Sequence, residues 1–446
     1  MAAETIVALS TPAGRGALAV IRVSGVDARE RCQHFLGVTL QPRVATFATF
    51  KTPAGVLDEV VATYFAAPRS YTGEDLVEIS CHGSLYVQQT LVATLLDAGC
   101  RMAEPGEFTR RAFLHGRLNL SQAEAVADLI DANGQAAHQM AVSQLRGGYA
   151  ATLAQLRQQL VEITALLELE LDFSDEEVEF ADRSHLLELL EQLCAQCRQL
   201  AESFSLGNAI RQGVSVAIVG PPNVGKSTLL NRLLNDDRAI VSDIPGTTRD
   251  TVEETLTLDG ITFRIIDTAG LRHSDDPVEQ AGIERSYNAA RRAQCILVVV
   301  DSATLLPSVM QQLKEAVDIS DKQVVVLLNK CDLEDVRQTE PTDVGCPLLH
   351  ISARTEAGLE LLSTQLTERY RFDADMPVVT NIRHYEALTH IVTACTAACN
   401  ALRQKCSADL VAIDLRDALH HLGAITGEVA PDEVLGTIFS RFCIGK

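Results

Sequence analysis

The chain has 446 residues, of which 38 are Lys or Arg and 59 are Asp or Glu, so its formal net charge is −21. This charge argues against a basic coat that would bind nucleic acid or an acidic membrane over the whole surface, but it does not exclude a local basic patch. With 47% hydrophobic residues the chain can bury several cores, and no stretch approaches the roughly 18 consecutive apolar residues that span a bilayer. The first ten residues are free of Lys and Arg, so we expect no secretory signal, a cytoplasmic protein and reduced thiols at its 12 scattered cysteines.

The first block, residues 1–116, is nearly neutral, with 10 basic and 11 acidic residues. Short apolar runs bounded by Gly and Pro predict strands, and residues 46–67 predict a hairpin with its turn at 53–55. Residues 84–98 have helical spacing that stops before Gly99. We therefore expect an α+β domain.

The second block, residues 117–212, carries a net charge of −9 and has neither Gly nor Pro from Tyr149 to Leu206. Residues 381–422 are also free of Gly and Pro, which predicts helices in the final block, residues 379–446, whose net charge is −1. In the second block apolar residues recur every three or four positions, which predicts a helical stripe of Leu153, Leu156, Leu160, Ile163 and Leu167.

Residues 213–378, with a net charge of −10, alternate apolar strand-like runs with helical segments. Continuously apolar runs are typical of parallel strands buried on both faces. The runs are VSVAIVG, FRIIDT, CILVVVDS, QVVVLLNK and LLHISA. The simplest organisation is an α/β domain inserted into an α-helical domain, both following the N-terminal α+β domain.

The motif GPPNVGKS starts at Gly220, directly after a predicted strand, and opens a predicted helix, which is the context of a phosphate-binding P-loop. Glycines let backbone amides turn toward phosphate oxygens. We expect Lys226 to reach the β- and γ-phosphates and the Ser227 hydroxyl to bind Mg²⁺. The other residues expected to contact the nucleotide are Asn223, Val224, Gly225 and Thr228.

Three further motifs follow at predicted strand ends. Asp267-Thr-Ala-Gly270 places Asp267 near the magnesium ion and the Gly270 amide near the γ-phosphate. In Asn329-Lys330-Cys-Asp332, the Asp332 carboxylate can accept two hydrogen bonds from guanine, whereas adenine has no such pair of donors.

The third motif, Ser352-Ala353, follows the next predicted strand, where the Ala353 amide can meet the guanine O6. The order of the motifs resembles that of the Ras-like translation-factor GTPases. The motifs therefore predict that the nucleotide is GTP.

The loop between the P-loop and Asp267 contains Gly-Thr-Thr-Arg-Asp, in which Thr248 can close over magnesium and sense the γ-phosphate. Leu271 follows Asp-Thr-Ala-Gly, in the place of the Gln that orients water in Ras-like enzymes. Another side chain must then orient the attacking water. Four downstream acids are candidates, Asp275, Asp276, Glu279 and Glu284.

The last four residues are Cys443-Ile-Gly-Lys446. A cysteine at this position resembles a prenylation motif, but Gly and Lys fit that motif poorly. Two readings remain for Cys443. It is either a small buried apolar side chain or a thiol that reacts with an electrophile.

Together these features resemble the MnmE (TrmE) family of tRNA modification GTPases, a TrmE-Era-EngA-like branch of the Ras-like GTPases, over essentially the whole chain. Related ribosome-assembly GTPases share the GTPase motifs but lack both ends. The resemblance is carried by TIVALSTPAGRGALAVIRVSG, SYTGED, CHGS, PGEFTRRAFLHGRLNLSQAEAVADLI, GTTRD, DTAGLR and the terminal CIGK.

The resemblance implies that residues 1–116 fold like folate-binding aminomethyltransferase domains, bind 5,10-methylene- or 5-formyl-tetrahydrofolate, and form a homodimer. The family's folate contacts match Arg22, Glu78 and Arg117, with Lys446 nearby. Most members have Lys where this chain has Arg117. Cys443 matches a thiol that the family requires.

In the GTPase domain, the resemblance implies a K⁺ ion near the phosphates in place of an arginine finger. Such a cation neutralises charge that develops between the β- and γ-phosphates. The water-orienting acid of the family matches Glu279. The matching K⁺ positions are Asn223, Ser242, Ile244 and Thr247.

The implied reaction modifies the wobble uridine, position 34, of certain tRNAs, in a complex with the FAD-containing partner MnmG. A one-carbon unit from methylenetetrahydrofolate becomes the C5 methylene of the uridine, and glycine or ammonium supplies the amine of the carboxymethylaminomethyl or aminomethyl group. Two alternatives stay open. In the first alternative, the chain is a ribosome-assembly GTPase switch. In the second, residues 1–116 form a dimer without binding folate.

Overall fold

The computed structural model of the chain describes residues 4–172, 183–234, 254–266, 279–333, 345–373, 376–429 and 431–446. The chain divides into two compact units. The first comprises Met1–Ala127, Gln144–Cys194 and His390–Lys446, and the second comprises Asp128–Ser143 and Ala195–Thr389.

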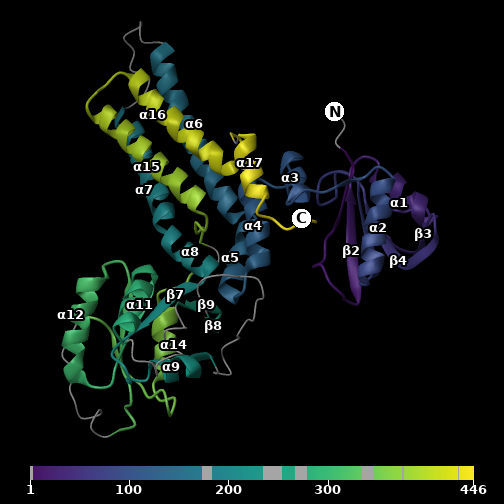
Figure 1. The fold of residues 1–446 in the computed structure, drawn as a ribbon. Helices are drawn as coiled ribbons and strands as arrows, with labels where there is room; N and C mark the ends of the chain where they lie inside the picture. Colours follow the sequence, from purple (N-terminus) through teal and green to yellow (C-terminus); the bar gives the residue numbers. More distant parts are fainter. Residues whose placement is uncertain are drawn as a thin grey trace. The chain divides into compact units, whose positions relative to one another are not determined.

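The first unit begins with a six-stranded sheet in the order β3-β4-β5-β2-β1-β6. Figure 1 labels its strands β2, β3 and β4. Its strands pair antiparallel except for β1 and β6, which are parallel. The predicted hairpin is confirmed, because β3 and β4 pair across a turn at residues 53–54. The strands are β1 (Ile6–Leu9), β2 (Leu18–Ser24), β3 (Ala45–Thr52), β4 (Gly55–Phe65), β5 (Leu76–His82) and β6 (Arg101–Met102).

The two faces of this sheet are covered by different helices. Successive residues of a strand point to opposite faces, so Ile21 and Ile79 pack into the core formed with α1 (Ala28–Leu36) and α2 (Leu85–Asp97). Arg22 and Glu78 lie on the other face. There Phe108 of α3 (Glu107–Leu114) packs with Ile6, Ala8 and Leu76.

Long helices make up the rest of the first unit, some of them extending beyond it. All five residues of the predicted stripe are buried in α6, with at most 1% of each side chain exposed. Helices α6 and α16 pack together, and Arg416 binds Glu168 at 2.7 Å between them. The helices are α4 (Leu120–Asp131), α6 (Gly148–Asp172), α7 (Arg183–Glu202), α15 (Ile382–Arg403), α16 (Ala408–Thr426) and α17 (Asp432–Phe439).

The second unit contains a six-stranded sheet in the order β12-β11-β10-β7-β9-β8. Its pairs are parallel except β8–β9, which is an antiparallel hairpin at the edge. The strands are β7 (Val214–Val219), β8 (Glu254–Leu258), β9 (Ile261–Ile265), β10 (Cys295–Val300), β11 (Gln323–Leu328) and β12 (Leu348–His350).

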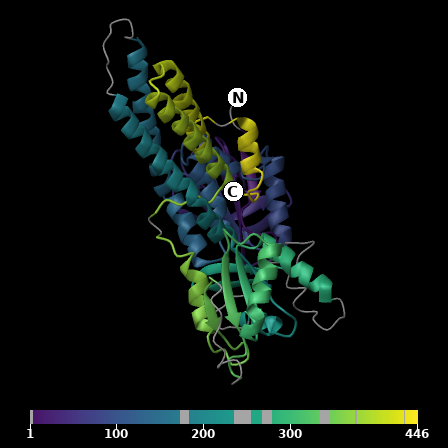
Figure 2. The same cartoon turned by 90° about the vertical axis from the view of Figure 1, so that its left-hand side faces the viewer.

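Helices pack on both faces of this sheet (Figure 2). One face meets α9 and α14, and the other meets α11 and α12, so every residue of β7, β10 and β11 is buried. The helices lying wholly or partly in this unit are α5 (Gln135–Leu145), α8 (Phe204–Gln212), α9 (Lys226–Leu234), α11 (Glu279–Arg292), η2 (Ala303–Leu305), α12 (Leu306–Ala316) and α14 (Leu359–Glu368).

The predicted fold class is confirmed. An α+β N-terminal sheet domain, a helical part and an α/β domain with a parallel sheet are all present. The sequence did not predict the edge strand β8. Of the helices that the structure describes, none is long and apolar enough to cross a membrane. The four block boundaries proposed from the sequence stay predictions.

Candidate functional site

The P-loop lies between β7 and α9, at the carboxyl edge of the parallel sheet of the second unit. Lys226 is the first residue of α9, and its ammonium group donates to the carbonyls of Gly220 at 2.8 Å and Pro221 at 2.5 Å. Burial lowers the pKa of Lys226. The cation therefore lies inside the loop, next to Ser227, which is an arrangement that fits a nucleotide phosphate and its Mg²⁺ ion.

Asn329 joins three of the predicted motifs. It follows β11, and only 2% of it is exposed. Its side-chain Nδ2 donates to the Val224 carbonyl of the P-loop at 2.7 Å, and its Oδ1 accepts from the Ala353 amide at 3.0 Å. The buried Asn329 side chain thus bonds its own motif to the P-loop and to the motif around Ala353.

Lys330 makes a second connection to the P-loop. Its ammonium group donates to the Asn223 carbonyl at 2.9 Å and to the Asp301 carboxylate at 2.7 Å. Asp301 was not predicted from the sequence, although it stands directly after the apolar strand β10, at the edge of the sheet where the ends of parallel strands meet. Asp301 fixes the Lys330 side chain beside the P-loop.

The carboxylate of Asp332, which is predicted to bind guanine, is held by a residue that follows β12. The Ser352 hydroxyl donates to Asp332 Oδ1 at 2.7 Å, and Ser352 itself is fully buried. This bond orients the Asp332 carboxylate. Phosphate-binding and base-binding groups therefore converge at one edge of the sheet, as a guanine nucleotide requires.

A second polar site lies on the face of the N-terminal sheet that carries Arg22 and Glu78. Arg22 of β2 and Glu78 of β5 are opposite each other in the pairing of these two strands. Arg22 donates from Nε and Nη2 to Glu78 Oε1, at 3.0 and 2.6 Å. The Arg22 guanidinium also lies over the rings of Tyr71, at 5.2 Å, and Phe108, at 5.8 Å. This face therefore presents a partly buried carboxylate, Glu78, bonded to an arginine that lies over two aromatic rings.

Comparison with known proteins identifies the family. The MnmE helical domain family matches residues 120–443, and the family described as the GTP-binding protein TrmE N-terminus matches residues 5–117. The tRNA modification GTPase MnmE of Parabacteroides distasonis is 46% identical, over 99% of this chain and 100% of its own length. The MnmE of Flavobacterium johnsoniae is 44% identical over 99% of both chains.

The chain belongs to the MnmE family. Among solved structures, the G domain of the T. maritima FeoB iron transporter matches 35% of this chain and 99% of its own, with 26% identity and a TM-score of 0.25. The family assignment follows from the two full-length relatives and from the two matching family domains.

Several of the site residues predicted from the sequence lie outside the part of the chain that the structure describes. Glu279 is the first residue of α11, but its side chain is outside the described part. The other predicted residues outside the described ranges are Ser242, Ile244, Thr247, Thr248, Asp267, Gly270 and the candidate acids Asp275 and Asp276.

The structure brings together some of the residues predicted to form the folate site, namely Arg22, Glu78 and Lys446. Lys446 is partly buried, and burial followed by the nearby charge of Arg22 lowers the pKa of Lys446. Cys443 is exposed, so the reading of a buried apolar side chain is wrong. Arg117 is exposed too, and no hydrogen bond or ion pair among the described residues joins it to Arg22 or Glu78.

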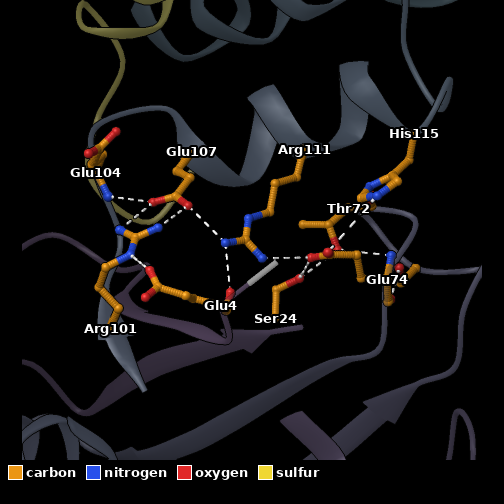
Figure 3. Close-up of polar contacts among 10 residues, drawn as sticks. Glu4, Ser24, Thr72, Glu74, Arg101, Glu104, Glu107, Arg111 and His115 are labelled. Carbon is orange, nitrogen blue, oxygen red and sulfur yellow. Dashed lines mark hydrogen bonds and ion pairs between the residues drawn. The ribbon is translucent and has the colours of Figure 1, made fainter. Parts of the chain in front are cut away.

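A buried ionic network next to this face was not predicted. Figure 3 shows Arg111 between two carboxylates, Glu74 at 2.9 Å and Glu107 at 2.9 Å. Glu107 also accepts from Arg101 and from the backbone amide of Glu104. Burial raises the pKa of Glu107, but the bonds from Arg101, Glu104 and Arg111 outweigh it and lower this pKa overall. The density of Arg and Glu in PGEFTRR is the sequence signal for this network.

Proposed function

We propose that this chain binds and hydrolyses GTP and couples hydrolysis to modification of the wobble uridine, position 34, of certain tRNAs. The observation that carries the proposal is the Asn329 side chain, which bonds the P-loop to the guanine-binding motif around Ala353 within a chain of the MnmE family. GTP and Mg²⁺ are the ligands of this edge of the sheet. The chain acts in the cytoplasm.

The finer chemistry is part of the same proposal. A tetrahydrofolate derivative supplies a one-carbon unit when it is bound, and Glu78 is the carboxylate on the sheet face that would bind its pterin ring. A K⁺ ion held through Asn223 supports hydrolysis, and Glu279 orients the attacking water. The chain works as a homodimer with MnmG, the FAD-containing partner, in a heterotetramer.

The charge distribution supports a shared tRNA-binding surface. Of the net charge of −21, residues 117–212 carry −9 and residues 213–378 carry −10, whereas the N-terminal and C-terminal blocks carry −1 each. Because phosphate binding needs cationic groups, this charge argues against an RNA coat formed by the chain alone. MnmG then supplies most of the basic contacts.

The test compares a deletion strain with a strain that carries the wild-type gene. We expect mass spectrometry of tRNA nucleosides to show loss of the C5 group from uridine 34 in the deletion strain, restored by the gene. Normal wobble uridines together with an altered ribosome profile would support the alternative, a ribosome-assembly switch that lacks tRNA-modifying activity.

The folate assignment has a separate test. We expect purified chain to bind 5-formyltetrahydrofolate in a calorimetric titration, and Glu78→Ala and Arg22→Ala to weaken that binding. If the wild type does not bind, residues 1–116 form a dimer without a folate site. If Arg22→Ala binds as tightly as the wild type, Arg22 is not a folate contact.

A further inference from the structure

The last residues of the chain lie against the N-terminal sheet, within the first unit. After α17, the Cys443 carbonyl accepts from the Gly106 amide at 3.4 Å. Two residues later, the Gly445 carbonyl accepts from the Ser10 hydroxyl at 3.1 Å and from Arg22 Nη1 at 3.3 Å. The main chain is therefore bound at the carbonyl of Cys443 and again two residues later at Gly445, while the Cys443 side chain is exposed.

Two glycines make this approach possible. Gly445 has φ +96°, and a Cβ atom there would lie 2.4 Å from the Leu9 carbonyl oxygen. Gly106 has φ +66°, and its Cβ would lie 2.6 Å from the Phe439 carbonyl oxygen. Both positions combine left-handed backbone with backbone contact that no side chain fits. Gly436, in α17, has nothing within 4 Å of its Cβ position.

The neighbours of Arg22 fix the orientation in which its side chain bonds the Gly445 carbonyl. Nε and Nη2 are bonded to Glu78, and the planar guanidinium lies over Tyr71 and Phe108. Nη1 is thereby aimed at the Gly445 carbonyl. A guanidinium is planar and has several donors in fixed positions, so it can bond Glu78 and the Gly445 carbonyl at the same time.

The turn that contains Gly106 is held by the network of Figure 3. Glu107 Oε2 accepts from the Glu104 amide at 2.9 Å, and Glu107 is bonded in turn to Arg101 and Arg111. These bonds fix the turn that precedes α3. The donor that meets the Cys443 carbonyl is part of this turn.

We propose that Ser10, Arg22 and Gly106 form a tail clamp, which binds the main chain of residues 443–445 and positions the Cys443 thiol at the Arg22–Glu78 face of the sheet. The three are positioning residues, and Gly445 is the tail residue that lets the clamp close. The functional part of this inference rests on the proposed role of Cys443 in tRNA modification. The clamp itself does not depend on that role.

The clamp is tested by limited trypsin digestion of the full-length protein. Cleavage after Arg441 requires the tail to open, and its rate follows the population of the open form when opening is fast. Quantitative mass spectrometry of the released peptide, residues 442–446, gives that rate. We expect the wild type to be cut far more slowly than a synthetic peptide of residues 436–446.

Four variants locate the effect. Ser10→Ala loses one hydrogen bond, and cleavage should be about two- to tenfold faster. Ser10→Thr keeps the hydroxyl and should restore the wild-type rate. Gly445→Ala should accelerate cleavage roughly tenfold or more, because it introduces strain and a backbone clash. Gly436→Ala is the matched glycine control and should behave as the wild type.

The outcomes separate the clamp from the proposed function. Wild-type cleavage as fast as that of the peptide, or equal rates for Ser10→Ala, Gly445→Ala and wild type, would overturn the clamp. In cells, Ser10→Ala and Gly445→Ala should lower wobble-uridine modification, whereas their purified proteins should hydrolyse GTP at the wild-type rate. If a deletion strain had normal wobble uridines, the proposed function would fail while the digestion result for the clamp would stand.

Discussion

The nucleotide site and the tail clamp differ in how their residues are brought together. In the nucleotide site the described residues lie in segments that follow the carboxyl ends of parallel strands of one sheet, and Asn329 bonds directly to Val224 and Ala353. In the tail clamp, Ser10 binds Gly445, which lies 435 positions away in the sequence. The first site belongs to one domain with a known motif order. The second exists only when the two ends of the chain meet.

This difference makes the two sites separable by mutation. A change at the guanine-binding edge should alter nucleotide binding or turnover but not trypsin cleavage after Arg441. A change in the clamp should do the reverse.

The largest effect is expected from Asp332→Asn. The amide cannot accept both guanine donors, so GTP affinity should fall roughly 10³-fold or more, and xanthosine triphosphate should bind better than GTP. Fluorescent nucleotide titration measures both. Ser352→Ala is the matched control. It removes only the hydroxyl bonded to Asp332 Oδ1, and it should cost about tenfold. Unchanged guanine selectivity in Asp332→Asn would show that another residue reads the base.

Glu279→Ala should reduce GTP turnover by about 10² to 10⁴-fold and leave GTP binding intact, because it removes the group expected to orient the attacking water. Single-turnover phosphate release gives the rate. Glu284, an exposed acid of α11, is the control, and Glu284→Ala should hydrolyse GTP normally. Full turnover by Glu279→Ala would move the role to another of the downstream acids.

The choice of monovalent cation should have a smaller effect. We expect hydrolysis to be roughly tenfold or more faster in KCl than in NaCl at equal ionic strength, since a bound K⁺ would neutralise charge developing on the phosphates. Steady-state phosphate release measures the ratio. Equal rates in the two salts would argue against the cation site expected near Asn223.

The smallest effect concerns the network behind the clamp. The pKa of Glu107 is lowered in the folded chain relative to its ordinary value of 4.5, so its stabilising contribution is present above pH 4.5. That contribution is lost as the pH falls through the lowered folded value. Glu107→Gln should therefore lower the free energy of unfolding by about 1 kcal/mol at pH 7.

The control for this prediction is the same comparison at acid pH. In urea-induced unfolding, the difference between wild type and Glu107→Gln should shrink as the pH falls below 4.5. A difference that stays constant with pH would mean that the charge of Glu107 does not stabilise the fold.

Much of this architecture could be predicted from the sequence. The apolar runs matched β7, β10 and β11 because strands buried on both faces need continuous apolar residues, and they also located β9 and β12, which are only partly buried. The stripe from Leu153 to Leu167 is buried in α6 because helical spacing places those residues on one face. Motif order placed Lys226, Asn329 and Asp332 at one edge of the sheet.

Other contacts could not be predicted from the sequence, because they depend on how the chain folds. Asp301 pairs with Lys330 only because β10 and β11 are neighbours in the sheet, which no local pattern records. The bond from Ser10 to Gly445 and the network around Arg111 depend on tertiary contacts between distant segments. For Cys443 the sequence left open a buried apolar side chain or a reactive thiol, and the exposure of this side chain in the fold excludes the first.

The most direct test of the proposed function is wobble-nucleoside mass spectrometry on cells whose only copy of the gene carries Cys443→Ser. The serine keeps the size of the side chain but lacks the thiol. We predict that the C5 group of uridine 34 is lost, as in the deletion strain, while the variant protein accumulates normally. Full modification in these cells would contradict the account, because it would show that tRNA modification does not need the thiol that the tail clamp positions.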